Sequence, residues 1–207
     1  TYITNGAIAD IILVYAKTDT KKSNKGISAF VVETKSLGFN VVSKLRKMGY
    51  RGSQTAEIFF DNCKVPEENM IGNEGTGHIT IMNGLDFERA MIAPICLGIS
   101  QRALEISIEY AKIREQFGKP ISSFQMIQSK IADMYTWVEA IKSMVYSVLS
   151  ECDNIDKKLA GKGKIHINTS ASVMFASTTS NKVLNEAVQI HGGMGYMWES
   201  EINRLYR

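Results

Sequence analysis

An apolar stripe in the second half of the sequence limits what this part of the chain can fold into. Between Ile121 and Val148, apolar residues recur at steps of three and four, the spacing that places side chains along one face of an α-helix. The stripe predicts one helix of about thirty residues, whose apolar face needs neighbours to cover it. Residues 78–112 and 163–188 are the candidates, and they would complete an antiparallel bundle. Pro94 lies in the first of these segments and is expected to kink or split it.

The first third of the sequence has a different pattern. Three short runs of β-branched and aromatic residues, at 11–15, 27–32 and 56–60, are separated by clusters of Gly, Asn and Lys. This pattern is typical of short strands, and we expect the three runs to form adjacent antiparallel strands.

A domain boundary is expected near residue 70. Gly and Pro residues punctuate the sequence up to Gly77, and beyond it the apolar spacing changes from about two to about three and a half residues. We therefore predict a mixed α and β fold, with an antiparallel β-domain portion in residues 1–70 and an antiparallel helical bundle in residues 71–207. The sequence opens at Thr1 without an initiator Met or a basic and apolar leader, so we interpret the chain as a fragment of a longer protein.

The charge balance and the spacing of Cys and His disfavour several classes of function. The net charge is +3, from 24 basic and 21 acidic residues, whereas a nucleic-acid-binding domain usually has a strongly basic face. Residues 16–51 carry nine Lys or Arg against two acidic residues, which favours a phosphate-bearing ligand, although a solvated face explains the same charges. The Cys and His residues lack metal-ligand spacing, and no apolar run reaches about 18 residues, so we expect neither a metal site nor membrane insertion.

The first motif that could carry chemistry is Leu-Asp-Phe-Glu-Arg at residues 85–89. On a helix, Asp86 and Arg89 share a face, while Glu88 lies among apolar neighbours. A carboxylate in such a setting suits a general base. A solvated Glu beside an ordinary Asp/Arg pair explains the same residues.

Two further motifs suit the binding of a phosphate-bearing ligand. In residues 114–120, Arg114 suits a bidentate contact to phosphate, and Phe117 offers a flat apolar surface beside it. Residues 189–196 contain three glycines in four positions, and their backbone amides suit a pyrophosphate. Each motif also has a purely structural interpretation, as a helix end followed by a turn.

Together, and in this order, the motifs resemble those of the acyl-CoA dehydrogenase family. The matching segments are residues 2–6 (Trp-Ile-Thr-Asn-Gly in the family, with Tyr2 in place of Trp), 48–53 (Gly-x-Arg-Gly-Ser), 114–118 (Arg-x-x-Phe-Gly) and 189–196, the family's second signature. The resemblance covers essentially the whole chain. It implies that residues 1–70 are the carboxyl-terminal part of a middle β-domain, and that residues 71–207 are most of a truncated carboxyl-terminal helical domain.

The resemblance implies FAD as the cofactor, bound between subunits of a homotetramer that is a dimer of dimers. Thr4 would lie near N5 of the flavin ring, with Tyr2 and Ile3 beside it. The pyrophosphate and adenosine of a neighbouring subunit's FAD would be held by residues of the two later motifs: Arg114, Phe117, Gln125, Gln189, Ile190, His191, Gly192 and Gly193.

The position of Glu88 resembles that of the catalytic base in the isovaleryl-CoA and long-chain branches of the family. Residues 48–55 and 131–136 are most similar to the isovaleryl branch. The resemblance thus implies flavin-dependent α,β-dehydrogenation of a short branched acyl-CoA, isovaleryl-CoA to 3-methylcrotonyl-CoA in leucine catabolism. Glu88 would take the α-proton while the β-hydride passes to flavin N5. Contacts to the substrate are implied for Asn24, Lys25, Asp86, Phe87 and Arg89.

The resemblance also implies electron-transfer flavoprotein as the partner, in the mitochondrial matrix or the bacterial cytoplasm. Ile79 and Pro94 depart from the pattern of the isovaleryl branch, so a long-chain or another short-chain acyl-CoA dehydrogenase is the alternative. A relative that binds nucleic acid or assists assembly is a second alternative, which the near-neutral charge and Glu88 disfavour. The isolated chain, without half of the flavin pocket, is expected to be inactive.

Overall fold

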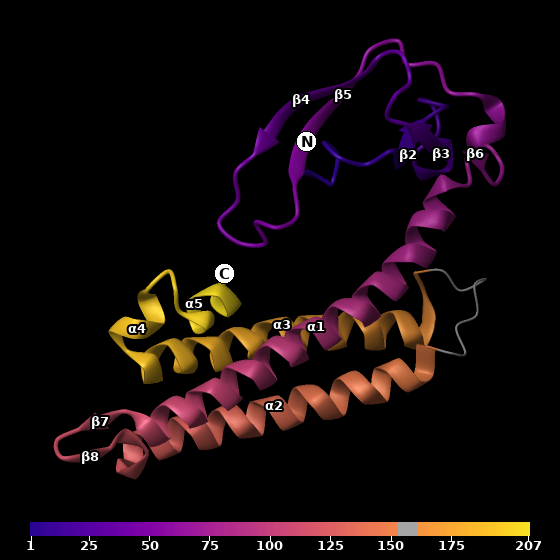
Figure 1. Ribbon diagram of the computed structural model, residues 1–207. Helices are drawn as coiled ribbons and strands as arrows, with labels where there is room; N and C mark the ends of the chain where they lie inside the picture. Colours follow the sequence, from indigo (N-terminus) through magenta and orange to yellow (C-terminus); the bar gives the residue numbers. More distant parts are fainter. Residues whose placement is uncertain (153–160) are drawn as a thin grey trace. The chain divides into compact units, whose positions relative to one another are not determined.

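The computed structural model describes residues 1–152 and 161–207 (Figure 1). The chain divides into two compact units, Thr1–Met82 and Asn83–Arg207. The division falls inside helix α1 (Gly77–Ile113), which begins in the first unit and continues through the second. Antiparallel sheets occupy the first unit and helices the second, so the predicted mixed α and β fold is confirmed.

The first unit contains two antiparallel three-stranded sheets. One has the order β2-β3-β6 and consists of β2 (Ile11–Lys17), β3 (Ile27–Glu33) and β6 (Met70–Ile71). The other has the order β1-β5-β4 and consists of β1 (Ile3–Thr4), β5 (Thr55–Phe60) and β4 (Phe39–Leu45). Short 3₁₀ turns, η1 (Asn24–Gly26) and η2 (Glu67–Asn69), precede β3 and β6.

The predicted strand pairing is right for two of the three runs. β2 and β3 are antiparallel neighbours, but β5 pairs with β4 in the other sheet. The sequence did not predict β4, because polar residues interrupt its apolar run and its register shifts between Val41 and Ser43. Such a bulge breaks the period of two on which strand prediction depends.

The second unit is built on three long helices that lie side by side in Figure 1. α1 is followed by a hairpin of β7 (Glu115–Gln116) and β8 (Lys119–Pro120), the 3₁₀ turn η3 (Ile121–Ser123) and α2 (Gln125–Cys152). The chain ends with α3 (Gly163–His191), α4 (Gly193–Tyr196) and α5 (Glu201–Tyr206).

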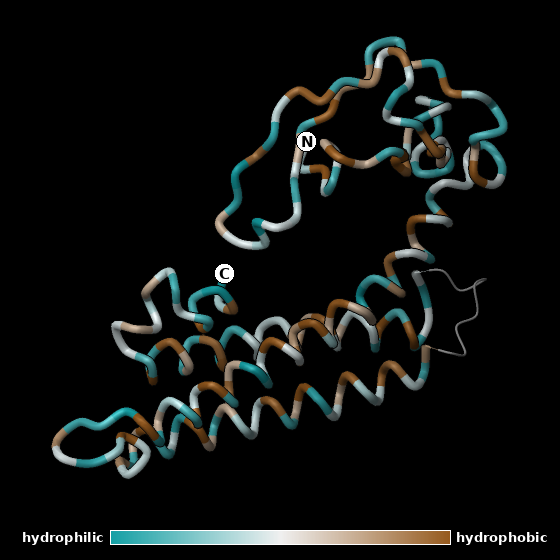
Figure 2. The backbone as a smooth tube through the Cα atoms, in the orientation of Figure 1, coloured by the Kyte–Doolittle hydropathy of each residue, from teal (hydrophilic) through white to brown (hydrophobic). Residues whose placement is uncertain are grey.

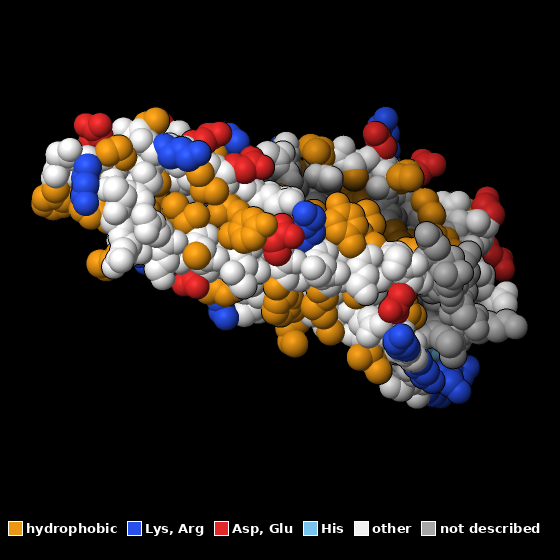
Figure 3. Space-filling view, turned by 90° about the horizontal axis from the view of Figure 1, so that it is seen from below, with side chains coloured by type: hydrophobic (Ala, Val, Ile, Leu, Met, Phe, Trp, Pro, Cys, Tyr) orange, Lys and Arg blue, Asp and Glu red, His pale blue; other side chains and the backbone are white. Residues whose placement is uncertain are grey.

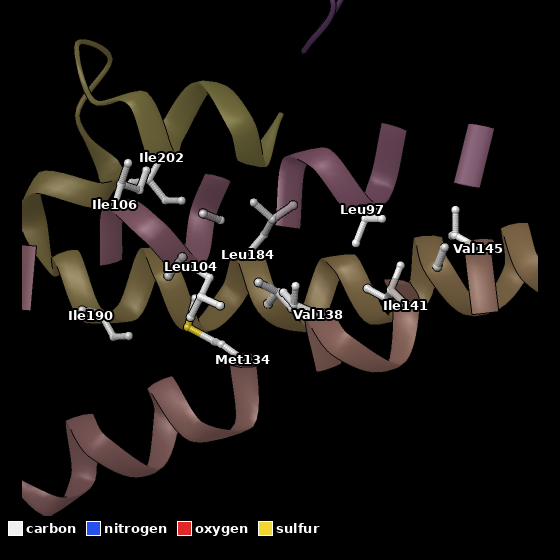
Figure 4. Close-up of a cluster of buried hydrophobic side chains, with 14 of the residues drawn as sticks. Leu97, Leu104, Ile106, Met134, Val138, Ile141, Val145, Leu184, Ile190 and Ile202 are labelled. Carbon is white, nitrogen blue, oxygen red and sulfur yellow. The ribbon is translucent and has the colours of Figure 1, made fainter. Parts of the chain in front are cut away.

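The predicted apolar stripe forms the buried face of α2. Figure 2 shows apolar and polar residues alternating along this helix. Its buried residues are Met134, Val138, Ile141, Val145 and Val148. In Figure 4, the first four of these meet side chains of α1 and α3. The helix begins at Gln125, later than the stripe, because the stripe's first residues lie in η3 and at its end.

α1 runs without a break through Pro94, so the predicted split does not occur. Proline removes the N–H that would bond the carbonyl of Ala90. Ala90, Ala93 and Leu97 are buried, so packing of this face stabilises the helix across the missing bond.

By length and composition alone, α1 is also the one helix in the described residues that is long and apolar enough to cross a membrane. Here it packs as a core helix against α2 and α3.

Candidate functional site

A buried carboxylate lies on α1, two residues before the predicted catalytic position. Asp86 is 2% exposed, and both of its oxygens have partners inside the protein. Nδ1 of His166 on α3 lies 2.6 Å from Oδ1, and the backbone N–H of Gly161 donates to Oδ2 at 3.1 Å. Nη1 of Arg89 lies 3.7 Å from Oδ1. The carboxylate of Asp86 therefore faces the protein and joins α1 to the start of α3.

Glu88 and its neighbour Phe87 are exposed to solvent. Met91 and Ile92 follow Glu88 by three and four residues, so they share its side of the helix, and they are 61% and 37% exposed. Among the residues that the structure describes, none forms an ion pair or a hydrogen bond with the Glu88 carboxylate. The carboxylate is thus accessible to a ligand, with apolar side chains beside it.

A groove of about 650 Å³ lies where the β7–β8 hairpin, the start of α2 and the end of α3 meet. Four of the predicted cofactor residues line it: Phe117, Gln125, Gln189 and Ile190. The remaining lining residues are Gln116, Lys119, Ile121, Ser123, Phe124, Met126, Ile127 and Lys130. Its size and its mixture of aromatic, amide and cationic side chains suit a nucleotide-sized ligand.

Phe117 has an unusual backbone conformation at the tip of the hairpin. Phe117 and Gly118 form its two-residue turn, with φ of 54° and 80°. Positive φ at both positions is the type I′ geometry, which favours Asn-Gly and disfavours a bulky first residue. The Phe117 ring is 92% exposed, and its centroid lies 6.1 Å from that of Phe124 in an edge-to-face arrangement. A strained and exposed aromatic residue indicates a functional role.

Cations flank this aromatic pair. Nζ of Lys119 lies 4.6 Å from the centroid of the Phe124 ring, and Lys130 forms an ion pair with Glu186 of α3. Arg114 directly follows α1 and is exposed, and its carbonyl accepts a hydrogen bond from the N–H of Ile121 at 2.8 Å. Arg114 is not one of the described residues that line the groove.

At the end of α3, one of the predicted cofactor residues is buried and the next two are exposed. His191 is buried, its ring stacks on Tyr110 at 4.4 Å, and its Nδ1 lies 2.8 Å from the carbonyl of Ala187. Its side chain therefore packs in the core and joins α3 to α1. Gly192 and Gly193 are exposed, with open space where a Cβ would stand.

The third glycine of this motif, Gly195, is buried and packs against α3. A Cβ at this position would lie 2.7 Å from the carbonyl of Val188, a distance that would displace the backbone. Glycine therefore allows the chain after α3 to fold back closely onto the helix.

The other predicted residues belong to the first unit. Ile3 and Thr4 pair with β5 as β1, and Tyr2 before them is 77% exposed with φ of 61°. Asn24 and Lys25 are exposed in η1, where they can meet a ligand.

Sequence reasoning missed His166, Lys119 and Lys130. His166 lies 80 residues from Asp86 in the chain, so no local pattern could connect them. Lys119 belongs to the motif at residues 114–120 and could have been found from its place two residues after Phe117. In the part of the chain that the structure describes, no group of three or more His, Cys, Asp or Glu is arranged to hold a metal ion.

Two models of known protein families match this chain. The family model described as acyl-CoA dehydrogenase, C-terminal domain, matches residues 75–207, and the model of the middle domain of the same family matches residues 1–63. The chain belongs to the acyl-CoA dehydrogenase family. The family predicted from the motifs is therefore confirmed.

Individual acyl-CoA dehydrogenases match over the whole chain. It is 44% identical to the mitochondrial 2-methylacyl-CoA dehydrogenase of Solanum tuberosum and 44% identical to the mitochondrial isovaleryl-CoA dehydrogenase of Oryza sativa subsp. japonica, covering 100% of this chain and 48% and 49% of those proteins. The solved structure of butyryl-CoA dehydrogenase from Megasphaera elsdenii matches with a TM-score of 0.89 and 42% identity, covering 99% of this chain and 52% of that one. The chain thus spans about half the length of the relatives that it matches.

Homologues in the acyl-CoA dehydrogenase family are FAD-dependent flavoproteins, as the sequence predicted. The residues in the groove fit part of such a cofactor. Phe117 offers an exposed ring, Gln125 and Gln189 offer amides, and Gly192 and Gly193 are exposed, with space where a Cβ would stand, so a ligand can approach their backbone closely.

Proposed function

We propose that this chain is part of a flavin-dependent dehydrogenase that removes the α and β hydrogens of a short branched acyl-CoA, converting isovaleryl-CoA to 3-methylcrotonyl-CoA in leucine catabolism. The observation that carries the proposal is the accessible Glu88 carboxylate on α1, beside the apolar Met91 and Ile92 and next to Arg89. An acyl thioester needs a carboxylate at the α-carbon, apolar surface for its acyl chain and a cation for its phosphates. α1 offers all three within two turns.

In this reaction Glu88 accepts the α-proton of the thioester on its carboxylate. Phe87, Met91 and Ile92 provide apolar contacts for the acyl chain, and they exclude water from the reacting carbons when a ligand covers them. FAD, when bound, supplies the acceptor for the β-hydride. Arg89, with Asp86 behind it, and Asn24 and Lys25 hold the CoA portion.

The groove residues Phe117, Gln125, Gln189 and Ile190 would hold the nucleotide part of FAD. Arg114 and the exposed Gly192 and Gly193 would contact its phosphates. In the first unit, Tyr2, Ile3 and Thr4 would lie against the flavin ring. Because the nucleotide would belong to a neighbouring subunit, the protein would act as a homotetramer, a dimer of dimers.

Electron-transfer flavoprotein is proposed as the electron acceptor, and the mitochondrial matrix as the compartment. The names of the plant relatives include the word mitochondrial, which supports this compartment over a bacterial cytoplasm. A 2-methyl-branched acyl-CoA is the second candidate substrate, because the relative named for it is equally similar to this chain.

A substrate panel on the full-length, flavin-loaded protein tests the proposal. Isovaleryl-, 2-methylbutyryl-, butyryl-, octanoyl- and palmitoyl-CoA are compared by kcat/KM with an artificial electron acceptor. We expect isovaleryl-CoA to give the highest value. A maximum with octanoyl- or palmitoyl-CoA would replace the branched substrate by a long-chain one, and a protein without flavin absorbance would overturn the proposed dehydrogenase altogether.

A further inference from the structure

We propose that His166 is a positioning residue for the CoA site, which acts by occupying the Asp86 carboxylate so that Arg89 stays available to an anionic ligand. The inference rests on the proposed function, because it needs a phosphate-bearing thioester as substrate. His166 lies on α3, outside every motif described above, and reaches the predicted site only through the fold.

The direction of the His166–Asp86 hydrogen bond follows from its partners. An ionised carboxylate only accepts hydrogen bonds, so Nδ1 of His166 donates to Oδ1 of Asp86 across 2.6 Å. Nδ1 then has no lone pair left for a second partner. Its separation of 3.4 Å from Nη1 of Arg89 is therefore a contact, and not another hydrogen bond.

Arg89 consequently has only a loose ion pair with Asp86. Its Nη1 lies 3.7 Å from Oδ1. In the same protein, Arg102 and Glu201 form a closed bidentate pair, with N···O distances of 2.9 and 3.0 Å. Asp86 does not form such a pair with Arg89: its closer partners are Nδ1 of His166 at Oδ1, across 2.6 Å, and the N–H of Gly161 at Oδ2, across 3.1 Å.

This arrangement keeps Arg89 near a negative charge without using its donors. The Arg89 side chain is 30% exposed, so its guanidinium can turn to a ligand. Guanidinium groups bind phosphates through two parallel hydrogen bonds, which requires that no carboxylate already occupies both donors. Without the donor on His166, Oδ1 of Asp86 would lose its closest partner, and a tighter Asp86–Arg89 ion pair would compete with the CoA phosphates for the guanidinium.

The experiment compares two variants of His166 in the full-length, flavin-loaded protein. In H166N, Nδ2 of the amide stands near the position of Nδ1 and keeps the donor, whereas H166L has a similar volume and no donor. Each is assayed with isovaleryl-CoA and with the N-acetylcysteamine thioester of the same acyl group, which lacks the phosphates and the nucleotide of CoA. Because the histidine side chain is 26% exposed, both replacements are expected to be tolerated.

For H166L, we expect KM for isovaleryl-CoA to rise about tenfold, the loss of roughly 1.4 kcal/mol of binding, with kcat nearly unchanged. KM for the truncated thioester should not change, and H166N should restore the wild-type KM for the CoA ester. Asn168→Ala is the matched control, since Asn168 bonds Glu151 of α2 at 2.8 Å near the same end of α3. It should leave both KM values unchanged.

Equal KM changes for the two thioesters, a loss confined to kcat, or equal behaviour of H166N and H166L would overturn the positioning role. Wild-type kinetics for H166L in an active enzyme would do the same and leave the proposed function intact. A wild-type protein that oxidises no acyl-CoA would overturn the proposed function together with this inference. If H166L does not fold, H166A replaces it as the donor-free variant.

Discussion

Glu88 is the residue at which the proposed chemistry can be tested most directly, because its carboxylate has no ion-pair partner among the described residues. Glu88→Gln keeps the size of the side chain and removes the base. Flavin and acyl-CoA should still bind, while reduction of the flavin by isovaleryl-CoA, followed by stopped-flow absorbance, should slow by at least ~10²-fold.

Glu109→Gln is the control for this measurement. Glu109 is an exposed carboxylate on the same helix, and its replacement should leave the rate of flavin reduction unchanged. If Glu88→Gln reduces its flavin at the wild-type rate, Glu88 is not the base, and the assignment to the branched-chain reaction is lost with it.

Phe117 allows a second test, which separates function from stability. Its φ of 54° in a type I′ turn is unfavourable for Phe and favourable for Asn. Phe117→Asn should therefore maintain or raise the Tm of the protein, whereas removal of the exposed ring should lower the FAD content. The bound flavin is measured by absorbance and the Tm by calorimetry. A drop in Tm without a loss of flavin would show that the ring serves folding instead.

Individual residues were predictable where the motif is local, and not where the partner is remote. Phe117, Gln125 and Gln189 were named from sequence and line one groove in the structure. The partner of Asp86 was not predicted, because the sequence shows only that Arg89 follows three residues later. In the structure, His166 supplies the closest contact to its carboxylate, from a different helix.

At the scale of elements, periodicity predicts a helix well when one face is strongly apolar. The apolar stripe predicted both that α2 exists and which of its residues are buried. β4 was missed because its bulge and its polar residues hide the period of two. Pro94 does not split α1, because packing offsets the lost hydrogen bond, and this packing cannot be read from the sequence.

The short helix α5 is held to α1 by the closed pair between Arg102 and Glu201. Donation of hydrogen bonds from Arg102 lowers the pKa of Glu201 below its usual value of 4.5. The pair therefore stabilises the fold above pH 4.5 and is lost as the pH falls through the lower pKa of the folded state. Because both side chains are exposed to solvent, the pair contributes little to the stability of the fold.

Glu201→Gln should thus lower the free energy of unfolding at pH 7 by a small amount. The difference from wild type should shrink as the pH is lowered below 4.5. Urea unfolding across a pH series measures it, with the exposed Glu199→Gln as control. A difference that persists unchanged at low pH would mean that the side chain stabilises α5 through packing and not through charge.

At the scale of the whole molecule, the chain leaves apolar surface for partners. Figure 3 shows apolar side chains among charged ones on one face, and α2 exposes Met126, Tyr135 and Tyr146. Exposed apolar groups of this size are typical of surfaces that other chains cover. The helical period separates the inner face of α2 from its outer face, but it does not indicate what covers the outer face.

Arg114 tests whether the groove serves a neighbouring subunit. It is exposed beside the hairpin that carries Phe117, and a charge-assisted contact to phosphate contributes about 1.5–3 kcal/mol. In the full-length protein, Arg114→Ala should therefore weaken FAD binding at least about tenfold and loosen the proposed tetramer, because one nucleotide would contact both subunits. Lys112→Ala removes an equal charge from the last turn of α1 and should change neither property. Flavin content and mass by light scattering measure both effects. Unchanged values for Arg114→Ala would exclude a nucleotide shared across the interface, whereas loss of flavin from an intact tetramer would place the phosphates within one subunit.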